Sequence, residues 1–196
     1  MSVRELPDVS FGPRDIMWWG TFGFIVVEGW TIILTTAAWV YLQQNVQTWP
    51  PRGTALPSLG LPSVELVIML ASLPLVSWSN RVLRQFDLAS VRIGMTALGV
   101  IGLVLTGLHI AVLLVSLNVK WDSNAYGSAQ WLVLVHYGTL VLVEACEVIG
   151  LALAYWFAPV EDKHFPDGAD AMMYWYFMVG SFVALYFLCF IGPRLI

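Results

Sequence analysis

The stretch WWGTFGFIVVEGWTIILTTAAWVYL, from Trp18 to Leu42, decides the fold. A helix that crosses the hydrocarbon core of a bilayer needs about 20 mainly apolar residues, and this stretch is long enough. It also holds one acidic residue, Glu28, which lies about 20 Å along the helix from Asp15 if each residue adds 1.5 Å. Carboxyl groups at such a depth usually face a bundle interior or a water-filled cavity. The stretch therefore predicts a membrane helix that packs against others.

The composition extends this interpretation to the whole chain. Of the 196 residues, 59% are hydrophobic and 11% are charged, and the mean hydropathy is +0.76. Soluble domains carry about 25% charged residues. The apolar runs are continuous, whereas the strands of a membrane barrel alternate with a period of two. We therefore predict an all-α polytopic membrane protein, a bundle of five transmembrane helices that forms a single domain over 1–196. The predicted spans are 15–43, 62–84, 91–117, 126–158 and 170–194.

The nine Lys and Arg residues predict the orientation of the bundle. Six fall at the end that holds the N-terminus, namely Arg4, Arg14, Arg81, Arg84, Arg92 and Lys163. Three fall at the opposite end, namely Arg52, Lys120 and Arg194. Because loops rich in Lys and Arg tend to stay in the cytoplasm, we expect the N-terminus inside and the C-terminus outside.

The acidic residues within the predicted spans have distinct expected roles. Glu28 is either a structural acid that hydrogen-bonds to a neighbouring helix or part of a proton path or cavity wall, and the sequence leaves both open. Glu144 and Glu147 are three residues apart near the inner interface, so we expect both to reach water. Glu65 lies at the outer mouth of its span and is expected to be solvated.

Small and aromatic residues add two predictions about packing. Four glycines of the third predicted span form a face along which helices approach closely, as is usual in membranes. These are Gly94, Gly99, Gly102 and Gly107. Aromatic residues near predicted span ends are candidates for a lipid belt or a protein interface. The main ones are Trp18, Trp19, Tyr174 and Trp175.

Two histidines raise the possibility of a haem. His109 and His136 fall at similar depth if the third and fourth spans are antiparallel neighbours, and two facing histidines suit a b-type haem. The interpretation we favour is one hydrogen-bonded histidine in each helix. The sequence holds no Cys/His cluster, P-loop or dinucleotide fingerprint. We therefore expect this chain to bind no metal or cofactor of its own.

Short motifs that cover nearly the whole chain resemble subunit III of the haem-copper cytochrome c oxidases. Their order and spacing are similar to those of the family, including an acid in mid-helix at Glu28. The motifs are Trp18-Trp19-Gly20, Trp49-Pro50-Pro51, MLAS (Met69 to Ser72), Tyr126-Gly127-Ser128 and YWYF (Tyr174 to Phe177). The chain departs from the family where Tyr137 and Leu140 stand in place of histidines.

The resemblance implies a function. The five helices would match the last five of a seven-helix family whose members bind no haem or copper themselves. Such a subunit packs against the catalytic subunit I, and with subunit II forms a respiratory complex in the bacterial cytoplasmic membrane. It holds phospholipid in a cleft and supports proton uptake, while haem and copper belong to its partner.

Two alternatives stay open. One is the subunit-III-like accessory protein of nitric oxide reductases, which has a similar length and number of helices. The other is a small b-haem-binding or quinone-binding electron carrier that uses His109 and His136.

Overall fold

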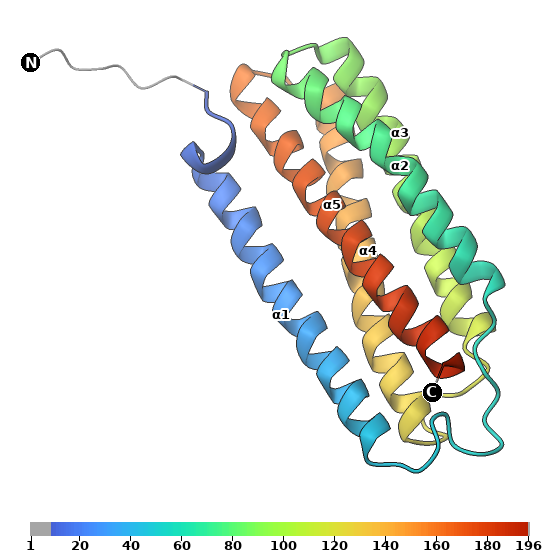
Figure 1. Ribbon diagram of the computed structural model, residues 1–196. Helices are drawn as coiled ribbons and strands as arrows, with labels where there is room; N and C mark the ends of the chain where they lie inside the picture. Colours follow the sequence, from blue (N-terminus) through green and yellow to red (C-terminus); the bar gives the residue numbers. More distant parts are fainter. Residues whose placement is uncertain (1–8, 196) are drawn as a thin grey trace, which may run out of the picture.

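The computed structural model describes residues 9–195, and within that range it contains helices and no strand (Figure 1). The predicted all-α fold is confirmed. Five helices are long and apolar enough to cross a membrane. They are α1 (Ile16–Gln44), α2 (Gly60–Arg84), α3 (Leu88–Ala111), α4 (Ala125–Phe157) and α5 (Phe165–Tyr186).

Helices α2 to α5 form a closely packed group, and α1 lies along its outside against α4 and α5 (Figure 1). Only 6% of the most apolar window of α1 is buried inside the chain, against 28–44% in the other four spans. Most of the α1 surface is therefore free to meet lipid or another protein.

The helix starts follow from local capping. The Asp15 side chain accepts a hydrogen bond from the backbone of Met17 at the start of α1, and Asp87 accepts one from Ser90 at the start of α3. Such bonds satisfy backbone N–H groups that have no partner within the helix. Hydrogen bonds from the side chain and the backbone N–H of Ser90 lower the pKa of the Asp87 carboxyl below its ordinary value.

Helix α5 begins five residues earlier than the sequence predicted, at Phe165 rather than residue 170. A proline such as Pro166 often interrupts or ends a helix. The proline instead lies in the first turn of α5, where its missing N–H would have no partner anyway. A short 3₁₀ turn, Asp162–His164, leads into it. At the other end α5 continues through a π-helical turn, Phe187–Ile191.

Glycines of α3 bring this helix close to its neighbours. A Cβ atom at Gly102 would lie 3.1 Å from the Cα of Ala145 on α4, and one at Gly99 would lie 3.2 Å from the Ile149 side chain. Gly94 approaches Ser79 of α2 in the same way. The prediction of a small-residue packing face is therefore confirmed for these three. It is wrong for Gly107, whose position has no neighbour within 4 Å.

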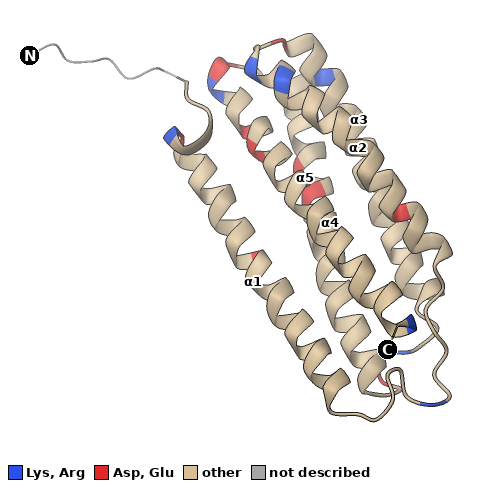
Figure 2. Ribbon diagram, in the orientation of Figure 1, with Lys and Arg blue, Asp and Glu red and all other residues tan. Residues whose placement is uncertain are grey.

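The Lys and Arg residues of the described chain gather at the two ends of the bundle (Figure 2). One end holds Arg14, Arg81, Arg84, Arg92 and Lys163, and the other holds Arg52, Lys120 and Arg194. These are the two groups expected from the sequence, except that Arg4 lies outside the described residues. Which end faces the cytoplasm stays a prediction.

Candidate functional site

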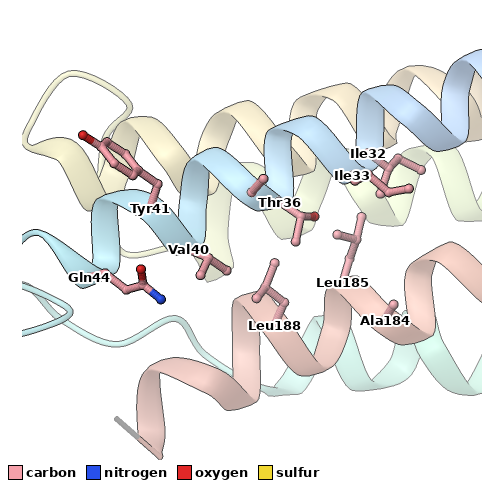
Figure 3. Close-up of a pocket in the computed structure, with 10 residues that line it drawn as sticks. Ile32, Ile33, Thr36, Val40, Tyr41, Gln44, Ala184, Leu185 and Leu188 are labelled. Carbon is pink, nitrogen blue, oxygen red and sulfur yellow. The ribbon is translucent and has the colours of Figure 1, made fainter.

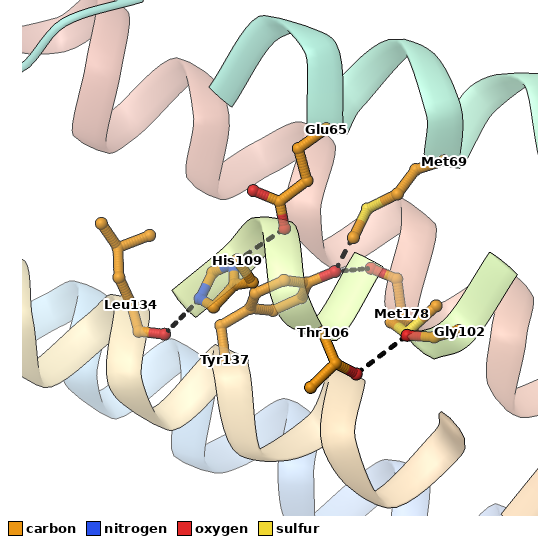
Figure 4. Close-up of polar contacts among 8 residues, drawn as sticks. All are labelled: Glu65, Met69, Gly102, Thr106, His109, Leu134, Tyr137 and Met178. Carbon is orange, nitrogen blue, oxygen red and sulfur yellow. Dashed lines mark hydrogen bonds and ion pairs between the residues drawn. The ribbon is translucent and has the colours of Figure 1, made fainter. Parts of the chain in front are cut away.

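A fully buried polar centre joins three helices. Glu65 of α2 and His109 of α3 are 0% and 1% exposed, and the Glu65 Oε1 atom lies 2.8 Å from Nδ1 of His109 (Figure 4). The other ring nitrogen, Nε2, lies 2.9 Å from the carbonyl oxygen of Leu134 on α4. The expectation that Glu65 is solvated is therefore wrong. Glu65 shares one face of α2 with Met69 and Ser72, and that face points into the bundle.

The chemistry of the pair follows from its third partner. A carbonyl oxygen only accepts hydrogen bonds, so Nε2 of His109 must carry a hydrogen and donate it to Leu134. If the ring is neutral, Nδ1 is an acceptor and the Glu65 carboxyl donates its proton to it. If the ring is charged, Nδ1 donates to a carboxylate. In both states a single proton lies between Oε1 and Nδ1.

Packing holds the imidazole of His109 in this position. The Tyr137 ring lies 5.4 Å from it and the Phe182 ring 6.3 Å, centroid to centroid. The Tyr137 hydroxyl donates a 3.0 Å hydrogen bond to the carbonyl oxygen of Met178 (Figure 4). A Cβ atom at Gly138 would lie 2.8 Å from the imidazole, so a glycine is required beside the ring.

The structure does not bring the two histidines together as a haem site would need. Both ring nitrogens of His109 are engaged, with Glu65 and with Leu134. Leu134 and Gly138 are the residues of α4 that face His109. His136 is two residues from each of them and lies on the opposite face of α4, because residues two apart on a helix point in nearly opposite directions. It faces α1 instead, so the pair on which the haem hypothesis rests is absent from the described residues.

Glu28 of α1 faces that second histidine. Its Oε2 atom lies 3.4 Å from Nε2 of His136, and the two side chains are 18% and 20% exposed. The two atoms are not aligned for a hydrogen bond. Nothing in the sequence indicated that Glu28 and His136 contact each other. The structure pairs them where α1 packs on α4. The partner of the mid-membrane acid is therefore a side chain of the same protein.

Further acids line α4 and α5 toward the end that holds Arg84. Glu144 is 0% exposed and neither of its carboxyl oxygens has a hydrogen-bond partner among the described residues. The expectation that it reaches water is wrong, although Glu147, one turn further, is exposed. Asp170, which the sequence analysis did not single out, is also buried, with one unpartnered oxygen.

The structure divides the four aromatic belt candidates. Trp19 is 55% exposed near the start of α1, and Trp18 stacks on Phe22 beside it. Tyr174 and Trp175 are 2% and 0% exposed, so their assignment to a lipid belt or interface is corrected. They lie on the face of α5 that packs into the bundle, whereas the neighbouring Tyr176 is 42% exposed.

The buried aromatic residues connect distant segments. The Trp49 ring lies 5.1 Å from the Tyr126 ring, edge to face, and 5.3 Å from Trp39. The indole N–H of Trp175 donates a 2.9 Å hydrogen bond to the Ser72 hydroxyl. Trp49, Tyr126, Ser72 and Trp175 each belong to one of the short motifs described above, so these motifs contact one another in two pairs.

A groove of about 640 Å³ lies between α1 and the end of α5 (Figure 3). Its walls are mostly apolar, with Thr36, Tyr41 and Gln44 as the polar exceptions. The apolar side chains are Ile32, Ile33, Ala37, Val40, Ala184, Leu185 and Leu188. An apolar groove open toward the membrane has the chemistry of an acyl-chain site.

No family model and no curated protein matches this chain.

Proposed function

We propose that this chain is a non-catalytic integral membrane subunit of a haem-copper respiratory oxidase. In this role it stabilises the catalytic subunit, binds phospholipid and supports proton uptake. The observation that carries the proposal is the contact of the Trp49 motif with the Tyr126 motif, and of the Ser72 motif with the Trp175 motif. The resemblance to subunit III therefore rests on residues that hold the bundle together, as the motifs of a shared fold would.

The groove between α1 and α5 supports the lipid-binding part of the proposal. Its volume of about 640 Å³ and its apolar walls suit the acyl chain of a phospholipid. Glu28 lies one helical turn from the groove residue Ile32 and pairs with His136. An acid beside an imidazole at the edge of this groove supports the proton-uptake part of the proposal.

Purification through an affinity tag on this chain tests the proposal. In mild detergent we expect a large catalytic subunit with haem and copper to co-purify, together with a subunit II and phospholipid. The complex should consume oxygen in a bacterial membrane preparation. Haem that stays with this chain after every other subunit has been removed would contradict the proposal and favour the electron carrier.

The same preparation separates the second candidate. The accessory protein of a nitric oxide reductase would co-purify with a catalytic subunit that consumes nitric oxide and not oxygen. The resemblance fits the oxidase subunit and the nitric oxide reductase protein equally well. The measured substrate of the complex therefore decides between them.

A further inference from the structure

A second groove lies on a different face of the bundle, between α3 and α4. It has a volume of about 370 Å³ and is lined by apolar side chains and one glycine, with Thr96 the exception on α3. The wall residues include Gly99, Val100, Leu103, Ile149 and Leu153. Val100 and Leu103 are 57% and 59% exposed, so the groove opens outward. It runs along the helices, and Thr96 to Leu103 covers about 10 Å at 1.5 Å per residue.

A fixed cation stands at the end of this groove nearest the loop between α2 and α3. The Nε of Arg92 donates a 2.7 Å hydrogen bond to the carbonyl oxygen of Tyr155. The Arg92 guanidinium lies 5.1 Å from the centre of the Trp156 ring, and the Trp156 indole N–H donates a 3.0 Å bond to the Thr96 hydroxyl. The Tyr155 carbonyl and the Trp156 ring thus hold Arg92 at the mouth of the groove.

The orientation of Arg92 leaves its charge available. Within residues 9–195 the two terminal NH₂ groups make no hydrogen bond and no carboxylate pairs with them. Terminal guanidinium groups are strong donors to phosphate oxygens. A tryptophan beside the cation also suits the headgroup level of a membrane.

We propose that Arg92 and the α3–α4 groove bind an anionic phospholipid. The phosphate accepts hydrogen bonds from the free NH₂ groups of Arg92, and one acyl chain lies in the groove against Val100 and Leu103. The arrangement matches a lipid in the membrane, because the charged group stands at the helix ends and the apolar groove extends toward the middle. The charge of Arg92 selects an anionic headgroup over a zwitterionic one. This site needs no catalytic partner, so it does not depend on the function proposed above.

Native mass spectrometry of the purified full-length protein tests the site. The probes are phosphatidylglycerol and phosphatidylcholine with the same acyl chains. We expect the wild-type protein to retain phosphatidylglycerol more strongly. One Lys or Arg near an anionic lipid surface is worth about 1 kcal/mol, so Arg92→Gln should reduce the retention of phosphatidylglycerol about fivefold, to the level of phosphatidylcholine.

Two further variants separate the site from general effects. Arg81→Gln removes the same charge from an exposed position at the same end of the bundle and should reduce the retention of phosphatidylglycerol much less than Arg92→Gln does. Val100→Trp keeps Arg92 but fills the groove from an exposed position, and should reduce the retention of both lipids. Equal effects of Arg92→Gln and Arg81→Gln would overturn the proposal. Full lipid retention by Val100→Trp would also overturn it. So would a photo-cross-linking group placed at residue 100 that reacts with another protein subunit and not with lipid.

Discussion

At the scale of single residues, carboxyl and imidazole groups meet in pairs within the bundle. Glu65 with His109 is fully buried and closely bonded, whereas Glu28 with His136 is partly exposed and 3.4 Å apart. A polar group without a partner in an apolar environment costs free energy, so each pair accommodates two groups that would be costly alone. The close pair is expected to stabilise the fold, and the looser pair is freer to respond to its surroundings.

We predict that His109→Ala destabilises the protein more than Glu65→Gln. Alanine leaves both oxygens of Glu65 buried and unpartnered, which should lower the free energy of unfolding by about 1–3 kcal/mol. The amide of Gln can still donate to Nδ1 of His109, so its effect should be small. The measurement is the thermal midpoint of the purified protein in detergent.

The matched control for this pair is Glu161→Gln, a change to an exposed carboxyl in the loop before α5. The double variant Glu65→Leu/His109→Leu should lose less stability than His109→Ala, because it removes both polar groups together. If His109→Ala left the thermal midpoint unchanged, the pair would have no structural role.

The partners of these residues could not be predicted from the sequence. Glu65 shares a helix face with Met69 and Ser72, but a membrane helix is apolar on nearly every side, so hydrophobic periodicity does not reveal which face is buried. His109 and His136 were correctly assigned similar depths in neighbouring helices. Their directions depend on the rotation of each helix about its axis, and packing between helices sets that rotation.

At the scale of helices, α3 and α4 approach closely where Gly102 faces Ala145. The absent side chain of Gly102 lets the backbone of α4 come within van der Waals contact at Ala145. In lipid, hydrophobicity gives no drive for helix association, so close packing of this kind holds a bundle together. The sequence predicted the small-residue face from the spacing of four glycines. It could not predict that Gly107 points away, because that too depends on helix rotation.

We predict that Gly102→Ala is destabilising and that Gly107→Ala is not. A Cβ atom at residue 102 would lie 3.0 Å from the Cβ and 3.1 Å from the Cα of Ala145, so the helices would have to move apart. Overpacking of this kind costs about 1–3 kcal/mol. Residue 107 has free space, and alanine favours a helix over glycine by up to about 1 kcal/mol. Thermal unfolding of both variants in the same detergent measures the difference, and equal midpoints would contradict the packing argument.

At the scale of the whole molecule, the five-helix architecture followed from composition and the length of apolar runs. The thickness of the membrane sets how long an apolar run must be, so spanning helices can be predicted without knowing any contact between residues. The start of α5 could not be predicted in the same way. Pro166 suits the first turn of a helix as well as the linker before one, and the sequence alone does not distinguish the two.

The two ends of the bundle make the orientation testable with engineered cysteines. Arg84 ends α2 at one end, and Arg52 lies in the loop between α1 and α2 at the other, with one helix crossing between them. Both side chains are exposed. Cys146 is exposed and should first be replaced by alanine, whereas Cys189 is buried and should not react.

The basic residues are more numerous at the Arg84 end, so we predict that this end is cytoplasmic. A membrane-impermeant maleimide should then label Arg52→Cys in intact cells and Arg84→Cys only after the cells are opened. The reverse pattern would overturn the orientation, and labelling of both from outside would show that α2 does not cross the membrane.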